Sequence, residues 1–224
     1  MSSTVAMAAS NVSGSISNQT RGAGIKSTAI GAKSKAEVGA VKVKNSNVSG
    51  RVSNQVTGAG IKATSIGYKS KAQVGTTDIE KSNVSGSVSN QVRGAGIKST
   101  AIGYKSEAQV GSVNLKNSNV SGRVSNQVTG AGLKSTAIGY KSKAQVGAAN
   151  IEKSNVSGSV SNQVRGAGIK ATSIGYKTKA RVGTVDVKNS TVSGNVSNQV
   201  TGAGIKSTAI GYKSESNVGS VVVE

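Results

Sequence analysis

The side chains of this 224-residue chain that could take part in chemistry are mostly lysines and arginines. It contains 28 Lys and Arg but only eight Asp and Glu, which gives a formal net charge of +20 at pH 7. Such a charge attracts polyanions, for example DNA or acidic polysaccharide. It also keeps a β-rich protein soluble, so the charge alone does not decide between a binding role and a structural role.

Catalysis and metal binding have few residues available. The chain contains no His and no Cys, which are needed by most imidazole-assisted nucleophiles and by ordinary zinc or copper sites. Asp78 and Glu80 are the only close pair of acids on one face, and Lys81 adjoins them. The recurring phrase Gly-Ala-Gly-Ile-Lys-Ser-Thr lacks the Gly that directly precedes Lys in a phosphate loop. We therefore expect no enzyme, no catalytic residues, no metal and no cofactor.

The charged residues recur because the chain is a tandem repeat. Asn-Val-Ser-Gly begins at 11, 47, 83, 119 and 155, and Thr-Val-Ser-Gly begins at 191, always 36 residues apart. We expect an N-terminal lead-in over 1–10 and a six-repeat unit over 11–224, divided into 11–46, 47–82, 83–118, 119–154, 155–190 and 191–224. All 30 glycines fall at five repeat positions, which indicates corners or close backbone approaches.

Apolar and polar residues alternate within each repeat. The inward-facing set predicted for the second copy is Val48, Val52, Asn54, Val56, Ala59, Ile61, Ala63, Ala72, Val74 and Ile79. This period of two predicts strands, three per repeat, and stacking equal units in register pairs their edges. We predict an all-β fold, a β-solenoid of six stacked 36-residue coils with parallel in-register strands. A weak half-repeat allows two 18-residue coils instead, but it would align a core Val with a surface Lys.

Stacking turns each repeat position into a column of side chains. The predicted core column of asparagines is Asn18, Asn54, Asn90, Asn126, Asn162 and Asn198. A buried amide is unfavourable unless it is hydrogen-bonded, so we expect an Asn ladder. A second column alternates in charge, which suits direct neighbours: Lys44, Glu80, Lys116, Glu152, Lys188 and Glu224.

Uniform lysine columns are the predicted contact for a polyanion. One consists of Lys26, Lys62, Lys98, Lys134, Lys170 and Lys206, and a second consists of Lys33, Lys69, Lys105, Lys141, Lys177 and Lys213. Solvated lysines that splay apart are the simpler interpretation. The alternating column would continue from Glu224 to Lys44 of another copy, so we also predict a homopolymer that grows head to tail.

The repeat resembles repeats of two protein families. Asn-Val-Ser-Gly-Ser-Val-Ser-Asn-Gln-Val is similar to repeats of bacterial functional-amyloid fibre subunits of the Fap and curli type, which implies a secreted, self-assembling biofilm fibre. Ser-Thr-Ala-Ile-Gly-Tyr-Lys-Ser-Lys-Ala at 135–144 resembles head repeats of trimeric autotransporter adhesins. We expect an extracellular or cell-surface structural fibre, with an adhesin or phage-fibre rod, or a polyanion-binding module, as alternatives. We see neither a signal peptide nor an apolar stretch of membrane-spanning length.

Overall fold

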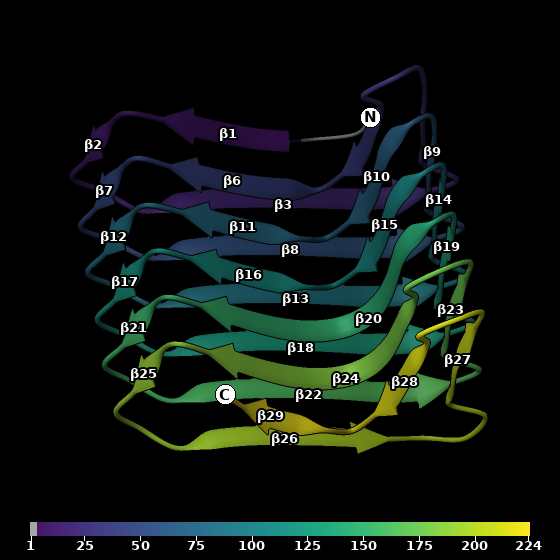
Figure 1. Cartoon of the computed structure of the whole chain (residues 1–224). Coiled ribbons are helices and arrows are strands. Elements are labelled where there is room, and N and C mark those ends of the chain that lie inside the picture. Colours follow the sequence, from purple (N-terminus) through teal and green to yellow (C-terminus); the bar gives the residue numbers. More distant parts are fainter. Residues whose placement is uncertain (1–3) are drawn as a thin grey trace.

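Residues 4–224, described by a computed structural model, form a solenoid in which the chain winds through six coils (Figure 1). The coils build four parallel sheets, named sheets A to D. Equivalent strands pair one repeat apart, so Val88 lies between Val52 and Val124. The predicted all-β solenoid of six 36-residue coils is confirmed, and the alternative of 18-residue coils is wrong.

Sheets B, C and D each contain six strands, one from each coil. Sheet B consists of β2 (Asn11–Val12), β7 (Asn47–Val48), β12 (Asn83–Val84), β17 (Asn119–Val120), β21 (Asn155–Val156) and β25 (Thr191–Val192). Sheet C consists of β3 (Ile16–Ala23), β8 (Val52–Ala59), β13 (Val88–Ala95), β18 (Val124–Ala131), β22 (Val160–Ala167) and β26 (Val196–Thr201). Sheet D consists of β4 (Lys26–Ile30), β9 (Lys62–Ile66), β14 (Lys98–Ile102), β19 (Lys134–Ile138), β23 (Lys170–Ile174) and β27 (Lys206–Ile210).

Sheet A is the 11-stranded sheet and has two arms that meet at a bend. The first arm contains β5 (Lys35–Val38), β10 (Lys69–Val74), β15 (Lys105–Val110) and β28 (Glu215–Val218). The second arm contains β1 (Thr4–Ala8), β6 (Ala40–Lys44), β11 (Thr77–Glu80), β16 (Val113–Lys116) and β29 (Val221–Val223). Two strands, β20 (Lys141–Glu152) and β24 (Lys179–Lys188), run through both arms.

A glycine at the bend of sheet A lets the two arms meet close to sheet C. Gly75 has φ of +60°, and a Cβ on it would collide with the side chain of Val92. Glycine is the residue that adopts this left-handed conformation at little cost. The cross-section is therefore narrow at the bend and wider on either side of it.

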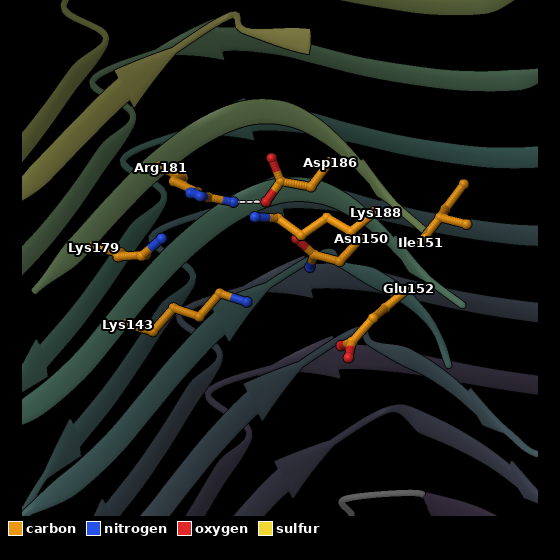
Figure 2. A pocket seen from close by; sticks show the side chains of 8 residues that line it. All are labelled: Lys143, Asn150, Ile151, Glu152, Lys179, Arg181, Asp186 and Lys188. Atoms are coloured by element: carbon orange, nitrogen blue, oxygen red, sulfur yellow. Dashed lines mark ion pairs between the residues drawn. The ribbon is translucent and has the colours of Figure 1, made fainter. Parts of the chain in front are cut away.

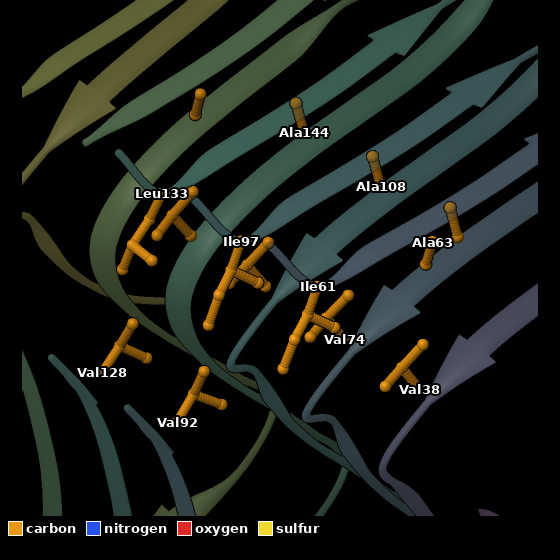
Figure 3. Packing of buried hydrophobic residues seen from close by; sticks show 14 of the residues in the cluster. Val38, Ile61, Ala63, Val74, Val92, Ile97, Ala108, Val128, Leu133 and Ala144 are labelled. Carbon is orange, nitrogen blue, oxygen red and sulfur yellow. The ribbon is translucent and has the colours of Figure 1, made fainter. Parts of the chain in front are cut away.

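The core consequently has two apolar lobes. One lobe lies between sheet D, the first arm of sheet A and the end of sheet C, and includes Ile61, Val74 and Val92 (Figure 3). The other lies between sheet B, the second arm and the start of sheet C, and includes Val48 and Val52. Small β-branched residues suit these thin lobes because they pack well on a pleated surface.

The number of strands and one inward residue were predicted wrongly. Four of the six repeats supply five strand segments each, and the two with a continuous sheet A strand supply four, in place of three. Ala59 is exposed, because the chain turns between β8 and β9 at Gly60, where φ is +63°. The alternation restarts after that turn at Ile61, which is buried.

The lead-in contributes a strand to the solenoid. β1 pairs with β6 in the same 36-residue register, with Thr4 beside Ala40 and Ala8 beside Lys44. It therefore adds a rung to the second arm of sheet A, beyond the first coil (Figure 1). Residues 1–3 of the predicted lead-in lie outside the described residues. Among residues 4–224 there is no helix of the length and apolarity that crossing a membrane requires.

Candidate functional site

The asparagine column forms a continuous amide ladder inside the solenoid. Each Nδ2 donates to the Oδ1 of the asparagine in the next coil, from Asn18 to Asn198, at 3.1, 3.0, 2.9, 2.8 and 2.9 Å in order. Asn54 Nδ2 also donates to the carbonyl oxygens of Gly39 (2.8 Å) and Thr76 (3.1 Å). The ladder therefore joins sheet C to the bend of sheet A and satisfies backbone groups that lie between the two apolar lobes.

The alternating Lys/Glu column lies on the outside of the second arm. Among residues 4–224, ion pairs within this column join Lys44 to Glu80 (3.4 Å), Lys116 to Glu152 (4.0 Å) and Lys188 to Glu224 (2.6 Å). The side chains are 38–60% exposed, so water and salt screen these pairs and they contribute little to stability. The structure thus pairs coils one with two, three with four, and five with six through this column.

The lysine column that begins at Lys26 is in register on sheet D. Lys98, for example, lies between Lys62 and Lys134. All six side chains of this column are exposed and point away from the core. They are solvated neighbours of one another, and the long side chains are free to splay apart.

A half-buried charge network on the outer side of the bend was not predicted. Lys71 Nζ lies 3.4 Å from an oxygen of Asp78 and 3.6 Å from an oxygen of Glu107. Asp78 also accepts hydrogen bonds from Gln73 Nε2 (3.2 Å) and from Asn114 Nδ2 (2.5 Å). The columns that begin at Lys35, Glu37 and Lys42 carry mostly charged or amide residues, but only the bend of sheet A brings these columns together.

Burial and opposing charge act against each other in this network. Burial favours the neutral forms, but the carboxylates of Glu107 and Asp78 outweigh it and raise the pKa of Lys71. Burial also opposes ionisation of Asp78, yet the charge of Lys71 and the hydrogen bonds from Asn114 and Gln73 lower the pKa of Asp78. Both side chains are therefore charged at neutral pH.

The same network continues through the last coils, where it is richer in cations (Figure 2). Arg181 is buried and pairs with Asp186, and its Nη2 lies 2.8 Å from Glu215. Lys179 Nζ is also 2.8 Å from Glu215. Burial raises the pKa of Glu215, but hydrogen bonds from Lys179 and Arg181 lower it overall.

The tyrosines form a second ladder at the corner between sheets D and A. Rings from Tyr68 to Tyr212 stack on one another, with centroids 5.1, 4.9, 4.7 and 5.1 Å apart. An exposed isoleucine column runs beside them on sheet D, from Ile30 to Ile210. All five tyrosines occupy the same position of the repeat, so in-register stacking places them in one column.

The asparagine and tyrosine ladders hold neighbouring coils together. The lysine columns present positive charge to the solvent. Within residues 4–224 there is no cluster of three or more His, Cys, Asp or Glu side chains that could hold a metal ion.

Comparison with known proteins finds one similarity. The family model described as the YadA head domain repeat matches residues 23–38 and 131–146. The second match contains the segment 135–144 on which the predicted resemblance to adhesin head repeats was based. Searches of curated proteins and of solved structures found no match. The matched segments form the end of a sheet C strand, a sheet D strand and the first arm of sheet A. The solenoid fold and this similarity together indicate an adhesin-like or fibre-like structural protein.

Proposed function

We propose that this protein is a subunit of an extracellular fibre in which copies stack head to tail through the ends of the solenoid. The main support is the geometry of those ends. At one end β2, β3 and β4 each have a single pairing strand among residues 4–224, and at the other end so do β25, β26 and β27. Open edges of this kind are templates for pairing with another chain.

The sequence of the end coils is complementary in the predicted register. One repeat beyond Glu224 is the position of Lys44 in a second copy, and one repeat beyond Thr201 is that of Arg21. Parallel in-register strands with amide ladders and stacked aromatic rings also occur in cross-β fibres. These features support a functional-amyloid type of fibre, and the YadA head repeat similarity supports a place at the cell surface.

One strand stands in the way of simple stacking. If sheets B, C and D of two copies pair one rung apart, β1 of the second copy falls at the level of β29 of the first. Both strands would pair at the same edge of sheet A, because β1 lies one rung before β6 and β29 lies in the sixth coil. We infer that β1 leaves its place on β6 before the second copy can dock.

Substitutions in β1 test this proposal directly. Val5 and Met7 are half-buried against the second apolar lobe, so Val5→Asp/Met7→Asp should release β1 and expose the edge of β6. Negative-stain microscopy should then show filaments at concentrations where the unaltered chain is still present as single rods. Circular dichroism checks that the solenoid remains folded.

Thr4→Asp/Ala6→Asp is the matched control, because it adds the same charge to the exposed face of β1. It should assemble like the unaltered chain. Folded Val5→Asp/Met7→Asp protein that stays monomeric at every concentration and salt would contradict head-to-tail stacking and favour an adhesin rod that acts singly.

A further inference from the structure

A groove lined by lysines lies on the outer face of the first arm of sheet A. It has a volume of about 430 Å³, and its lining residues are Lys35, Lys69, Ser70, Lys71, Lys105, Ser106, Glu107, Lys141 and Lys143. We call it the lysine groove. Six lysines and one glutamate give it a strong excess of positive charge.

Two rows of side chains border the lysine groove. Lys69, Lys105 and Lys141 form the first row, one residue per coil, and are in register. The second row lies two residues further along the same strands and contains Lys71, Glu107 and Lys143 in consecutive coils. Successive charges in each row are therefore one rung, about 4.8 Å, apart, and the two rows are separated by about 7 Å along the strand.

Most of these lysines have no carboxylate partner. Within residues 4–224, Lys71 is the one lysine of the groove with a carboxylate oxygen within 4.0 Å. Lys143 is half-buried and lies near other cations. Burial lowers its pKa, and although Glu107 opposes this, the nearby charge of Arg181 lowers it further. A bound anion would supply the counter-charge that this part of the groove lacks.

The dimensions favour one extended polyanion chain over a nucleic-acid duplex. Two rows about 7 Å apart are too close together to hold a duplex. In B-DNA each strand carries one phosphate per about 3.4 Å of helix axis and winds around that axis, out of step with straight rows of rungs. Single-stranded nucleic acid is usually held by bases stacked on aromatic faces. Beside the groove, Tyr68, Tyr104 and Tyr140 stack on each other at 5.1 and 4.9 Å, which covers most of their faces.

We propose that the lysine groove binds a single extended chain of an acidic polysaccharide, with carboxylate or sulfate groups paired to lysines on successive rungs. The main contact proposed for the polysaccharide is the column that contains Lys69, Lys105 and Lys141. The column that begins at Lys26 projects from the flat face of sheet D and serves as a comparison. The proposal concerns a single copy and does not depend on fibre growth.

Binding of polygalacturonate to the full chain, measured by calorimetry at several salt concentrations, tests the proposal. Lys69→Gln/Lys105→Gln/Lys141→Gln should weaken binding about tenfold, because three ion pairs are lost, and should reduce its salt dependence. The control Lys62→Gln/Lys98→Gln/Lys134→Gln removes the same charge from the same three coils on sheet D. It should weaken binding by less than about twofold through the general field.

Equal weakening by both triple variants would overturn the proposal, because the net charge alone would then explain binding. Tighter binding of a thymidine oligonucleotide than of polygalacturonate would overturn it in favour of nucleic acid. Dextran sulfate, which carries sulfate groups but no carboxylates, is tested in parallel and distinguishes sulfate from carboxylate as the preferred group. Binding of either polysaccharide must depend on the groove lysines.

Lys143→Gln provides a second test, in which stability should increase while binding of the polysaccharide weakens. Removing this half-buried charge should raise the melting temperature of the free protein, because the cost of partly desolvating an ammonium near the charge of Arg181 is lost. The same change should weaken polygalacturonate binding. A more stable protein that binds as tightly as the unaltered chain would show that the ligand lies elsewhere.

Discussion

At the scale of single residues, stacking places equivalent side chains of successive coils next to each other. Side chains differ in how well they tolerate a neighbour of the same type. An amide carries both a donor and an acceptor, so a uniform asparagine column can be buried, as from Asn18 to Asn198. An ammonium only donates. The two uniform lysine columns are both exposed, whereas the half-buried column that contains Lys71 and Lys143 is interrupted by acids, as at Glu107 between them.

The half-buried network around Asp78 should make stability depend on pH. The pKa of Asp78 is lower in the folded than in the unfolded protein, so its contribution is fully present above the unfolded value of about 3.9 and is lost as the pH falls through the folded value. Asp78→Asn should lower the free energy of unfolding by about 1–2 kcal/mol at pH 7. Urea denaturation at pH 7, and again well below pH 4, measures this difference, which should shrink in acid.

Glu80→Gln is the control for that measurement. Glu80 pairs with Lys44 at 3.4 Å, but its side chain is 40% exposed. Its loss should change the free energy of unfolding by less than about 1 kcal/mol at pH 7. An Asp78→Asn effect that is as small, or that stays the same in acid, would contradict the account of the network.

At the scale of strands and corners, the sequence predicts what depends on the repeat length alone. Equal repeats without insertions fix which coils touch, so the parallel pairing and the Asn54 column could be predicted. The alternation of inward and outward residues, however, restarts at each turn, so Ala59 was assigned to the wrong face. The bend of sheet A could not be predicted either, because it depends on Gly75 packing against Val92 on another strand.

A glycine substitution tests the packing of that bend. Gly111 and Gly132 have φ of +61° and +62°, so alanine at either should cost about 1–2 kcal/mol in backbone strain. A Cβ at Gly111 would also collide with Val128, whereas the nearest atom to one at Gly132 is 3.7 Å away. Gly111→Ala should therefore destabilise the protein by about 1–3 kcal/mol more than Gly132→Ala in urea denaturation. Equal losses would show that the bend has room for a methyl group.

At the scale of the whole molecule, the sequence predicted that the side-chain columns continue from one copy to the next. It did not predict that β1 occupies the edge of sheet A where the copies would meet. The register of β1 on β6 is visible only in the structure, since Thr4–Ala8 lacks the repeat phrase that marks the six copies. In the proposed head-to-tail growth, β1 of each added copy competes with β29 of the copy before it. The rung spacing fixes the geometry of the product: six rungs of about 4.8 Å give an axial repeat near 29 Å per copy.

X-ray fibre diffraction from aligned filaments of the Val5→Asp/Met7→Asp protein tests the central claim most directly. Copies stacked end to end predict a meridional reflection near 4.8 Å from the rungs, together with an axial repeat of about 29 Å from the six-coil subunit. Filaments that show the rung reflection without the subunit repeat, or whose 4.8 Å reflection lies on the equator, would contradict stacking through the solenoid ends.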